Sequence, residues 1–144
     1  MSNRMSYIKG LLFVSLLVVS IVGFSVGKIH KVVIQVSTSD PLTQKIALNN
    51  AVNIQKHYGV DNVKVEIVAY GPGLSIMTKK NILSQRVESL AISNIHFSAC
   101  GNTIKKVTKK KGKKPVLTGG VKVVPSGVVR LIELQGKGYA YIRP

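Results

Sequence analysis

The stretch KVVIQVSTSDPLTQKIALNNAVNIQKHYGVDNVKVEIVAYGPG, residues 31–73, contains a strand, a helix and a second strand in that order. Lys31–Ser37 is a β-branched apolar run, which predicts a buried strand. Asp40 before a proline is typical of a helix N-cap, and the near-helical spacing of apolar residues predicts a helix over Pro41–His57. Val63–Tyr70 then alternates with the period of a strand and ends at GPG. A strand–helix–strand unit of this kind favours a parallel sheet.

The remainder of the chain continues the alternation. The segment 128–135 fits either a helix or a strand by composition. Because right-handed crossovers place helices on both faces of a parallel sheet, we expect a three-layer α/β/α domain with five strands. The other predicted elements are a short helical turn at 74–77, helices at 79–93 and 104–111, and strands at 95–99, 121–124 and 139–142.

The first 27 residues have the composition of a leader rather than of a folded domain. Two basic residues precede an uncharged apolar run, Leu11–Val26. A positive start and a short apolar core are typical of a secretory signal peptide, and small residues before position 28 fit a cleavage site. An uncleaved N-terminal membrane anchor over residues 8–26 is the alternative. We expect the domain, residues 28–144, to be periplasmic or secreted, or held at the inner membrane by that anchor.

The composition narrows the class of protein. The chain has 144 residues, with 21 Lys and Arg against 5 Asp and Glu, a formal net charge of +16, and a single Cys. It is too short for a barrel enzyme of about 250 residues. One Cys excludes a disulfide framework within the chain and a cysteine-based zinc site. The charge calls for an anionic partner or surface.

Four small, polar or glycine-rich loops follow the predicted strands. Ligands of open parallel sheets bind outside the carboxyl ends of the strands, so these loops would share one edge and line one pocket. The candidate pocket residues are Ser37, Asp40, Tyr70, Gly71, Gly73, Gly101, Asn102, Thr103, Ser126 and Gly127.

Cys100 is the one residue of this edge with strong nucleophilic chemistry. It stands between a predicted strand end and a predicted helix start, where free backbone N–H groups and the helix dipole stabilise a thiolate. Asn102 and Thr103 are candidate caps of that helix. His96 leaves the strand on the same face as Cys100, so we consider a contact between the two. The alternative is a buried structural cysteine, since free cysteines are among the most buried residues.

Other chemistries lack a pattern in the sequence. The three His and one Cys form no metal motif, and we expect neither a metal nor a cofactor. The five acidic residues are dispersed, without a carboxylate pair for acid–base catalysis. The sequence contains no GxGxxG, P-loop or GxSxG motif.

A lysine-rich stretch, KKVTKKKGKK, follows Cys100 at residues 105–114. It suits nucleic acid, an anionic lipid surface or an acidic partner, but the lack of interleaved Arg and aromatic residues disfavours nucleic acid. A solvated loop that binds nothing is the simpler interpretation. The candidate residues for an anionic partner are Lys105, Lys106, Lys109, Lys110, Lys111, Lys113 and Lys114.

Several segments together resemble the DsrE-like family, in its branch with an N-terminal signal. They are KVVIQVS, LNNAVNIQKHYG, VEIVAYGPGL, FSACGNT and VVPSGVVRLIELQGKGYAYIRP, in this order over Lys31–Pro144. The resemblance implies a domain with flavodoxin-like layering, assembled as a homo-trimer or hexamer. In sulfur-relay members a cysteine carries a persulfide, and the matching residue here is Cys100. The leader and the lysine-rich insertion depart from the cytoplasmic relay proteins.

We therefore expect an exported sulfur-handling protein in which Cys100 carries a persulfide during sulfur transfer or sulfur oxidation. Its donor and acceptor would be proteins or small sulfane-sulfur compounds. The alternative is a non-catalytic DsrE-like binding or assembly module. In that case Cys100 is structural, and the lysine-rich loop docks an acidic partner or an anionic surface.

Overall fold

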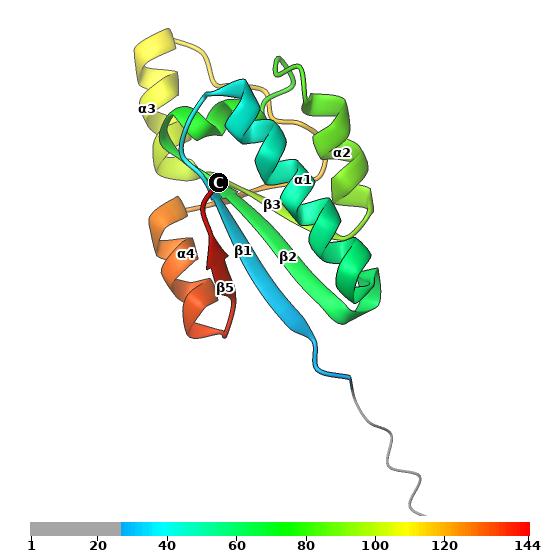
Figure 1. Ribbon diagram of the computed structural model, residues 1–144. Helices are drawn as coiled ribbons and strands as arrows, with labels where there is room; N and C mark the ends of the chain where they lie inside the picture. Colours follow the sequence, from blue (N-terminus) through cyan, green and yellow to red (C-terminus); the bar gives the residue numbers. More distant parts are fainter. Residues whose placement is uncertain (1–26) are drawn as a thin grey trace, which may run out of the picture.

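The five predicted strands form one parallel sheet in the order β4-β3-β2-β1-β5 (Figure 1), which confirms the α/β fold class. The computed structural model describes residues 27–144, so the predicted leader, except for Gly27, lies outside the described residues. β1 and β2 pair residue for residue along their whole length. The strands are β1 His30–Val36, β2 Val63–Ala69, β3 Ile95–Cys100, β4 Val121–Val124 and β5 Ala140–Ile142.

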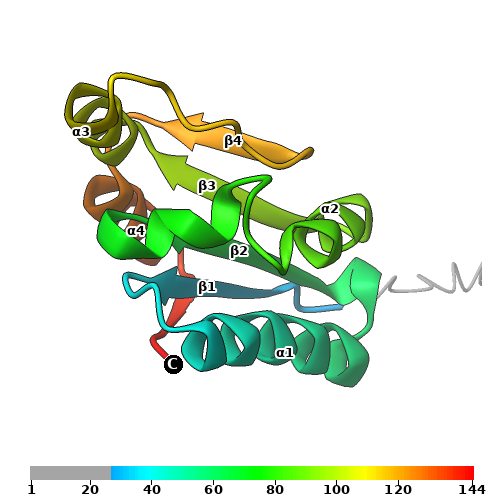
Figure 2. The ribbon, with the colours of Figure 1, turned by 90° about the horizontal axis from the view of Figure 1, so that it is seen from above.

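Helices connect the strands on both sides of the sheet (Figure 2). The segment 128–135, for which composition left two alternatives, belongs to a helix. Within residues 27–144, no helix has both the length and the apolar character needed to cross a membrane. The helices are α1 Pro41–Tyr58, α2 Ser84–Ile92, α3 Gly101–Lys111 and α4 Gly127–Gly136, with short 3-10 helices η1 Val60–Asn62 and η2 Gly71–Met77.

The helix predicted over residues 79–93 begins five residues later, at Ser84. Asn81 explains the difference, because its side-chain oxygen accepts a hydrogen bond from the N–H of Leu83 at 2.8 Å. Its amide nitrogen donates to Oε1 of Gln44 in α1 at 3.0 Å. Asparagine competes in this way with helical hydrogen bonds. The apolar pattern of residues 79–93 predicts Ile82 on the core face of this helix, but Ile82 lies in the turn and is 91% exposed, so that prediction was wrong.

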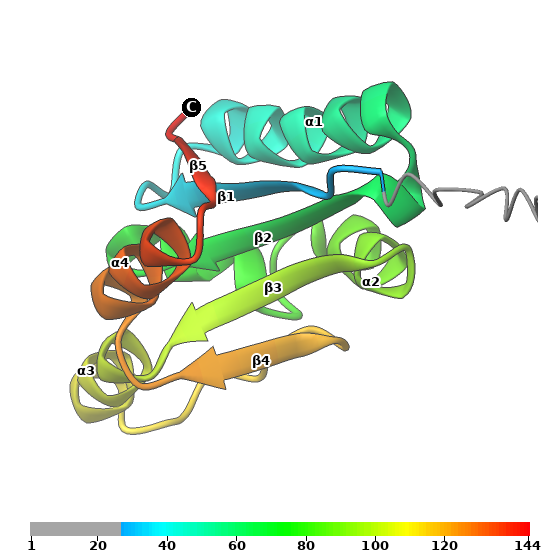
Figure 3. The same cartoon turned by 90° about the horizontal axis from the view of Figure 1, so that it is seen from below.

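The two faces of the sheet are covered unequally. One face packs against α1, α2, η2 and α3 and contains the main core, in which Ile34 and Phe97 are almost fully buried. On the other face, Leu131 and Leu134 of α4 form a smaller cluster with the sheet. Figure 3 looks onto this second face, where β3 and β4 remain uncovered along most of their length. The packing on the second face therefore depends on the position of α4.

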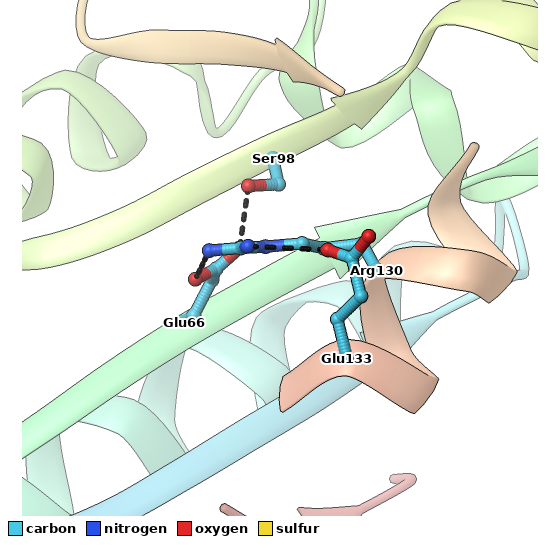
Figure 4. A network of polar contacts seen from close by, with 4 residues as sticks. All are labelled: Glu66, Ser98, Arg130 and Glu133. Carbon is cyan, nitrogen blue, oxygen red and sulfur yellow. Dashed lines mark hydrogen bonds and ion pairs between the residues drawn. The ribbon is translucent and has the colours of Figure 1, made fainter. Parts of the chain in front are cut away.

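A buried ion pair holds α4 on the second face (Figure 4). Glu66 of β2 is buried, and Arg130 of α4 donates to it from Nε to Oε1 and from Nη2 to Oε2, both at 2.8 Å. Ser98 of β3 donates to Oε1 at 2.7 Å. Burial raises the pKa of Glu66, but Arg130 and Ser98 outweigh it and hold that pKa below its usual value. The exposed Glu133, 3.5 Å from Arg130 Nη1, adds little.

Replacing the cation tests this anchor. In Arg130→Met the Glu66 carboxylate stays buried without its partner, and we expect the free energy of unfolding to fall by about 3 kcal/mol at neutral pH. In the wild type, Glu66 stabilises the fold above its unfolded pKa of about 4.3, and this stabilisation is lost as the pH falls through the lower folded pKa. The deficit of the variant should therefore shrink at acid pH, which urea unfolding at several pH values measures.

The double variant Glu66→Gln/Arg130→Met is the matched control. It removes both charges, so no unpaired carboxylate is left in the protein interior. We expect it to be more stable than Arg130→Met alone at neutral pH. Equal losses in the two variants would show that Arg130 acts by packing and not by pairing with Glu66.

Candidate functional site

Cys100 is the last residue of β3 and the N-cap of α3, so its predicted place between a strand and a helix is confirmed. It is only 5% exposed. Asn102 and Thr103 were wrong as candidate caps, because α3 already begins at Gly101 and both residues lie in its first turn. Cys100 itself is therefore the N-cap residue, at the positive end of the helix dipole, and its side chain makes no capping hydrogen bond.

Hydrogen-bond donors lie near the sulfur of Cys100. Burial raises the pKa of this thiol, but the nearby Thr103 hydroxyl and the N–H groups of Gly127, Thr103 and Asn102 outweigh burial. The pKa of Cys100 consequently lies below its usual value. Two helices take part, since Gly127 is the first residue of α4. Donors aimed at the sulfur stabilise the thiolate over the thiol, which makes Cys100 a better nucleophile.

Thr103 connects the sulfur to the loop after β2. The N–H of Gly71 donates to Thr103 Oγ1 at 2.9 Å. A hydroxyl has one hydrogen, and the contact from Gly71 leaves that hydrogen to donate to Cys100. Gly71 has a φ of +55°, a left-handed conformation that glycine adopts without strain. The turn at Gly71 thereby holds the loop after β2 against the first turn of α3.

Two other glycines allow three loops to meet at Cys100. A Cβ on Gly127 would lie 3.0 Å from Tyr70 Cβ and 3.3 Å from Cys100 Cβ. A Cβ on Gly101 would lie 3.1 Å from the carbonyl oxygen of Val124. Side chains at these positions would push the loops apart. The loops after β2, β3 and β4 are thus brought together around the thiol, as expected for the carboxyl edge of a parallel sheet.

Several predicted pocket residues have local roles instead. Asp40 caps α1 and accepts hydrogen bonds from the N–H and the hydroxyl of Thr43, both at 2.7 Å. Gly73 packs against the end of β1, where a Cβ would collide with the backbone. The Ser37 hydroxyl, directly after β1, accepts a hydrogen bond from the side chain of Gln35 in β1, and Ser126 is the N-cap of α4. None of these side chains donates to the sulfur.

His96 does not contact Cys100. The two residues lie on the same face of β3 but four positions apart, which separates them by about 13 Å along a strand. His96 is exposed, and its charge helps to lower the pKa of Glu66. In the part of the chain that the structure describes, no three His, Cys, Asp or Glu side chains lie together as metal ligands would.

The lysine-rich stretch is mostly helical. Lys105–Lys111 belong to α3, which ends at Gly112 with a φ of +65°. Lys109, Lys110 and Lys111 lie in its last turn, where positive side chains suit the helix dipole. The helix predicted at 104–111 is thus present and begins three residues earlier, at Gly101, whereas the interpretation as a loop was wrong for residues 105–111. The chain leaves the helix after Lys111.

The ion pair between Glu66 and Arg130 was not found from the sequence. Its signal was a glutamate directly before the apolar run Ile67–Ala69, because a buried carboxylate requires a partner. The spacing of residues in the sequence does not show which basic residue pairs with Glu66. Arg130 lies one turn after Gly127, so the pair fixes the start of α4 beside Cys100.

The chain belongs to the DsrE/DsrF-like family, whose model matches residues 30–144. This family is generally related to sulfur relay. A protein of unknown function, MTH1491 from Methanobacterium thermoautotrophicum, has a similar structure, with 30% sequence identity and a TM-score of 0.71 over 80% of this chain and 99% of that chain. The ychN protein from E. coli shares the fold at 14% identity, with a TM-score of 0.60 over 81% of this chain and 99% of its own. No curated protein sequence matches the chain.

Removing the Thr103 hydroxyl tests its role at the sulfur. Thr103→Val keeps the shape of the side chain but removes the donor that lowers the pKa of Cys100. We expect the pKa to rise and alkylation of Cys100 by iodoacetamide near neutral pH to slow several-fold, with the rate recovering at high pH. The pH profile of the alkylation rate measures both effects.

Thr108→Val is the control in the same helix. Its hydroxyl donates to the carbonyl oxygen of Ile104 at 2.8 Å, one turn beyond Thr103. This variant should keep the wild-type pH profile, and Thr103→Ser should largely restore it. A profile unchanged in Thr103→Val would mean that the backbone N–H groups alone stabilise the thiolate.

Proposed function

We propose that Cys100 carries a persulfide and passes sulfur from a donor to an acceptor. The observation that carries the proposal is the position of a single buried thiol at the start of α3 and against Gly127 at the start of α4, whose N–H groups help to lower its pKa. The thiolate is the form of cysteine that attacks sulfane sulfur. This attack therefore requires the thiolate to be stabilised near neutral pH. Membership in a family generally related to sulfur relay supports the same chemistry.

The transfer needs no external oxidant or reductant. The Cys100 thiolate attacks the outer sulfur of a donor R–S–SH, the donor S–S bond breaks, and the donor leaves as a thiolate. The new S–S bond gives the Cys100 persulfide. An acceptor thiolate then attacks the outer sulfur, and Cys100 leaves as the thiolate that the surrounding N–H groups stabilise. The hydrogen-bond donors near Cys100 thus stabilise its thiolate both before it attacks the donor and when it leaves at the end of the transfer.

The exported location is part of the proposal. It is supported by the apolar run at residues 11–26 and the basic residues before it. A second candidate function, a binding or assembly module with a structural Cys100, is favoured by the 5% exposure of that residue. The two functions differ in whether a reagent reaches the thiol in the folded protein.

Intact-mass analysis tests the persulfide directly. After exposure of the folded protein to a low-molecular-weight persulfide, we expect an adduct of one sulfur atom that a thiol acceptor removes again. Cys100→Ser is the control and should gain no sulfur. The mass of protein recovered from the native host also shows whether the leader is still present. A wild-type mass that does not change with the donor would favour the structural role of Cys100.

We also propose that the chain forms a homo-oligomer, a trimer or hexamer, through the outer face of α4. Val128, Val129 and Ile132 are all exposed on this helix, and clustered apolar side chains on a surface mark contacts with other chains. Since α4 begins beside Cys100, a neighbouring copy would lie close to the thiol.

A charge on the outer face of α4 tests this assembly. Ile132→Glu should reduce the molar mass in light scattering to that of a smaller species, because a buried unpaired carboxylate opposes association. Ile92→Glu places the same charge on an exposed isoleucine at the end of α2 and should leave the assembly unchanged. A wild-type monomer, or equal masses for the wild type and Ile132→Glu, would contradict the proposal.

A further inference from the structure

A groove of about 520 Å³ runs between α3 and the edge strand β4. Its rim carries Lys105, Lys109 and Lys114, and its apolar floor contains Ile104 and Val123. Gly101, the residue after Cys100, also lines the groove. The groove is thus next to the proposed sulfur site but is a separate feature, because Cys100 itself faces α4.

The rim lysines lack partners within the described chain. The ion pairs of residues 27–144 both involve Arg130 and none of these lysines. Lys105 and Lys109 stand four residues apart on one side of α3, a spacing at which like charges repel. The helix dipole accounts for the lysines in the last turn, but Lys105 lies outside that turn. An anion held between these side chains would relieve the repulsion.

The floor of the groove indicates what else the ligand must offer. Val123 is 53% exposed on β4, beside the almost buried Ile104. An apolar side chain laid on Val123 would remove this surface from water. A ligand that fits therefore combines negative charge with an apolar group.

We propose that this groove binds a short acidic segment of a partner protein, with its carboxylates on Lys105, Lys109 and Lys114 and an apolar side chain on Val123. A flat lipid surface is a poorer fit, because it would contact the lysines that point away from the groove as readily as those of the rim. The lining residues include no Arg and no aromatic side chain, which single-stranded nucleic acid uses for stacking. A peptide segment supplies both properties that the groove requires. This binding goes beyond the proposed sulfur transfer and does not depend on it.

Fluorescence anisotropy with a labelled peptide of alternating glutamate and leucine tests the groove. The triple variant Lys105→Gln/Lys109→Gln/Lys114→Gln should weaken binding about tenfold, since it removes three exposed ion pairs that each contribute modestly. The matched control Lys106→Gln/Lys110→Gln/Lys113→Gln removes the same charge from lysines that do not line the groove. It should weaken binding by no more than about twofold.

Val123→Gln tests the floor. We expect it to remove the preference of the protein for the leucine-containing peptide over a peptide of glutamate alone, because only the former has an apolar group to bury. Circular dichroism confirms that each surface variant is folded. The binding assay contains no sulfur donor, so its failure leaves the result on the Cys100 persulfide unaffected, and the reverse also holds.

Three outcomes would overturn the proposal. The first is no binding of the peptide by the wild type. The second is an equal loss in the two triple variants, which would show attraction by net charge alone. The third is tighter binding to phosphatidylglycerol vesicles or to a single-stranded oligonucleotide, with the same dependence on the rim lysines.

Discussion

The carboxylate of Glu66 lies within a sheet, where it has to be paired, and the position of α4 follows from that requirement. The guanidinium of Arg130 donates to both carboxylate oxygens of Glu66. Two such bonds fix both the position of α4 along β2 and its rotation about its own axis. Few apolar contacts hold α4 on this face, since its cluster is much smaller than the main core. Fixing α4 in turn fixes the N–H of Gly127 at Cys100. One ion pair in the middle of the sheet thereby determines the geometry at its edge.

At the edge of the sheet, the partial positive charges of two helix N-termini lie close to the sulfur of Cys100. α3 begins directly after Cys100, and α4 begins after the neighbouring strand, so two helix starts converge there. The Thr103 hydroxyl, which accepts a hydrogen bond from the N–H of Gly71, adds a side-chain donor from the first turn of α3. This arrangement is unfavourable for a cysteine with a purely structural role, because a neutral thiol is a poor acceptor for the hydrogen-bond donors around it. It is well suited to a sulfur atom that alternates between thiolate and persulfide.

The order of strands and helices could be predicted from the sequence because apolar spacing and breakers such as GPG act locally. The start of α2 could not, because the hydrogen bond from Asn81 to Gln44 joins segments far apart in the chain. At the site, the strand end and helix start at Cys100 were predicted from local pattern. The donation from Gly127 depends on the placing of α4, and hence on a long-range pair that spacing does not reveal. The meeting of Thr103 with Gly71 joins two separate loops in the same way.

The titration of Cys100 is the most direct test of the central claim, which is that the fold stabilises its thiolate. The chain has a single cysteine, so thiolate absorbance corrected with Cys100→Ser reports on this atom alone. We predict that Cys100 ionises at a lower pH in the folded protein than in the same protein in concentrated urea. Ionisation at an equal or higher pH in the folded protein would show that burial outweighs the donors, and Cys100 would then be a structural cysteine.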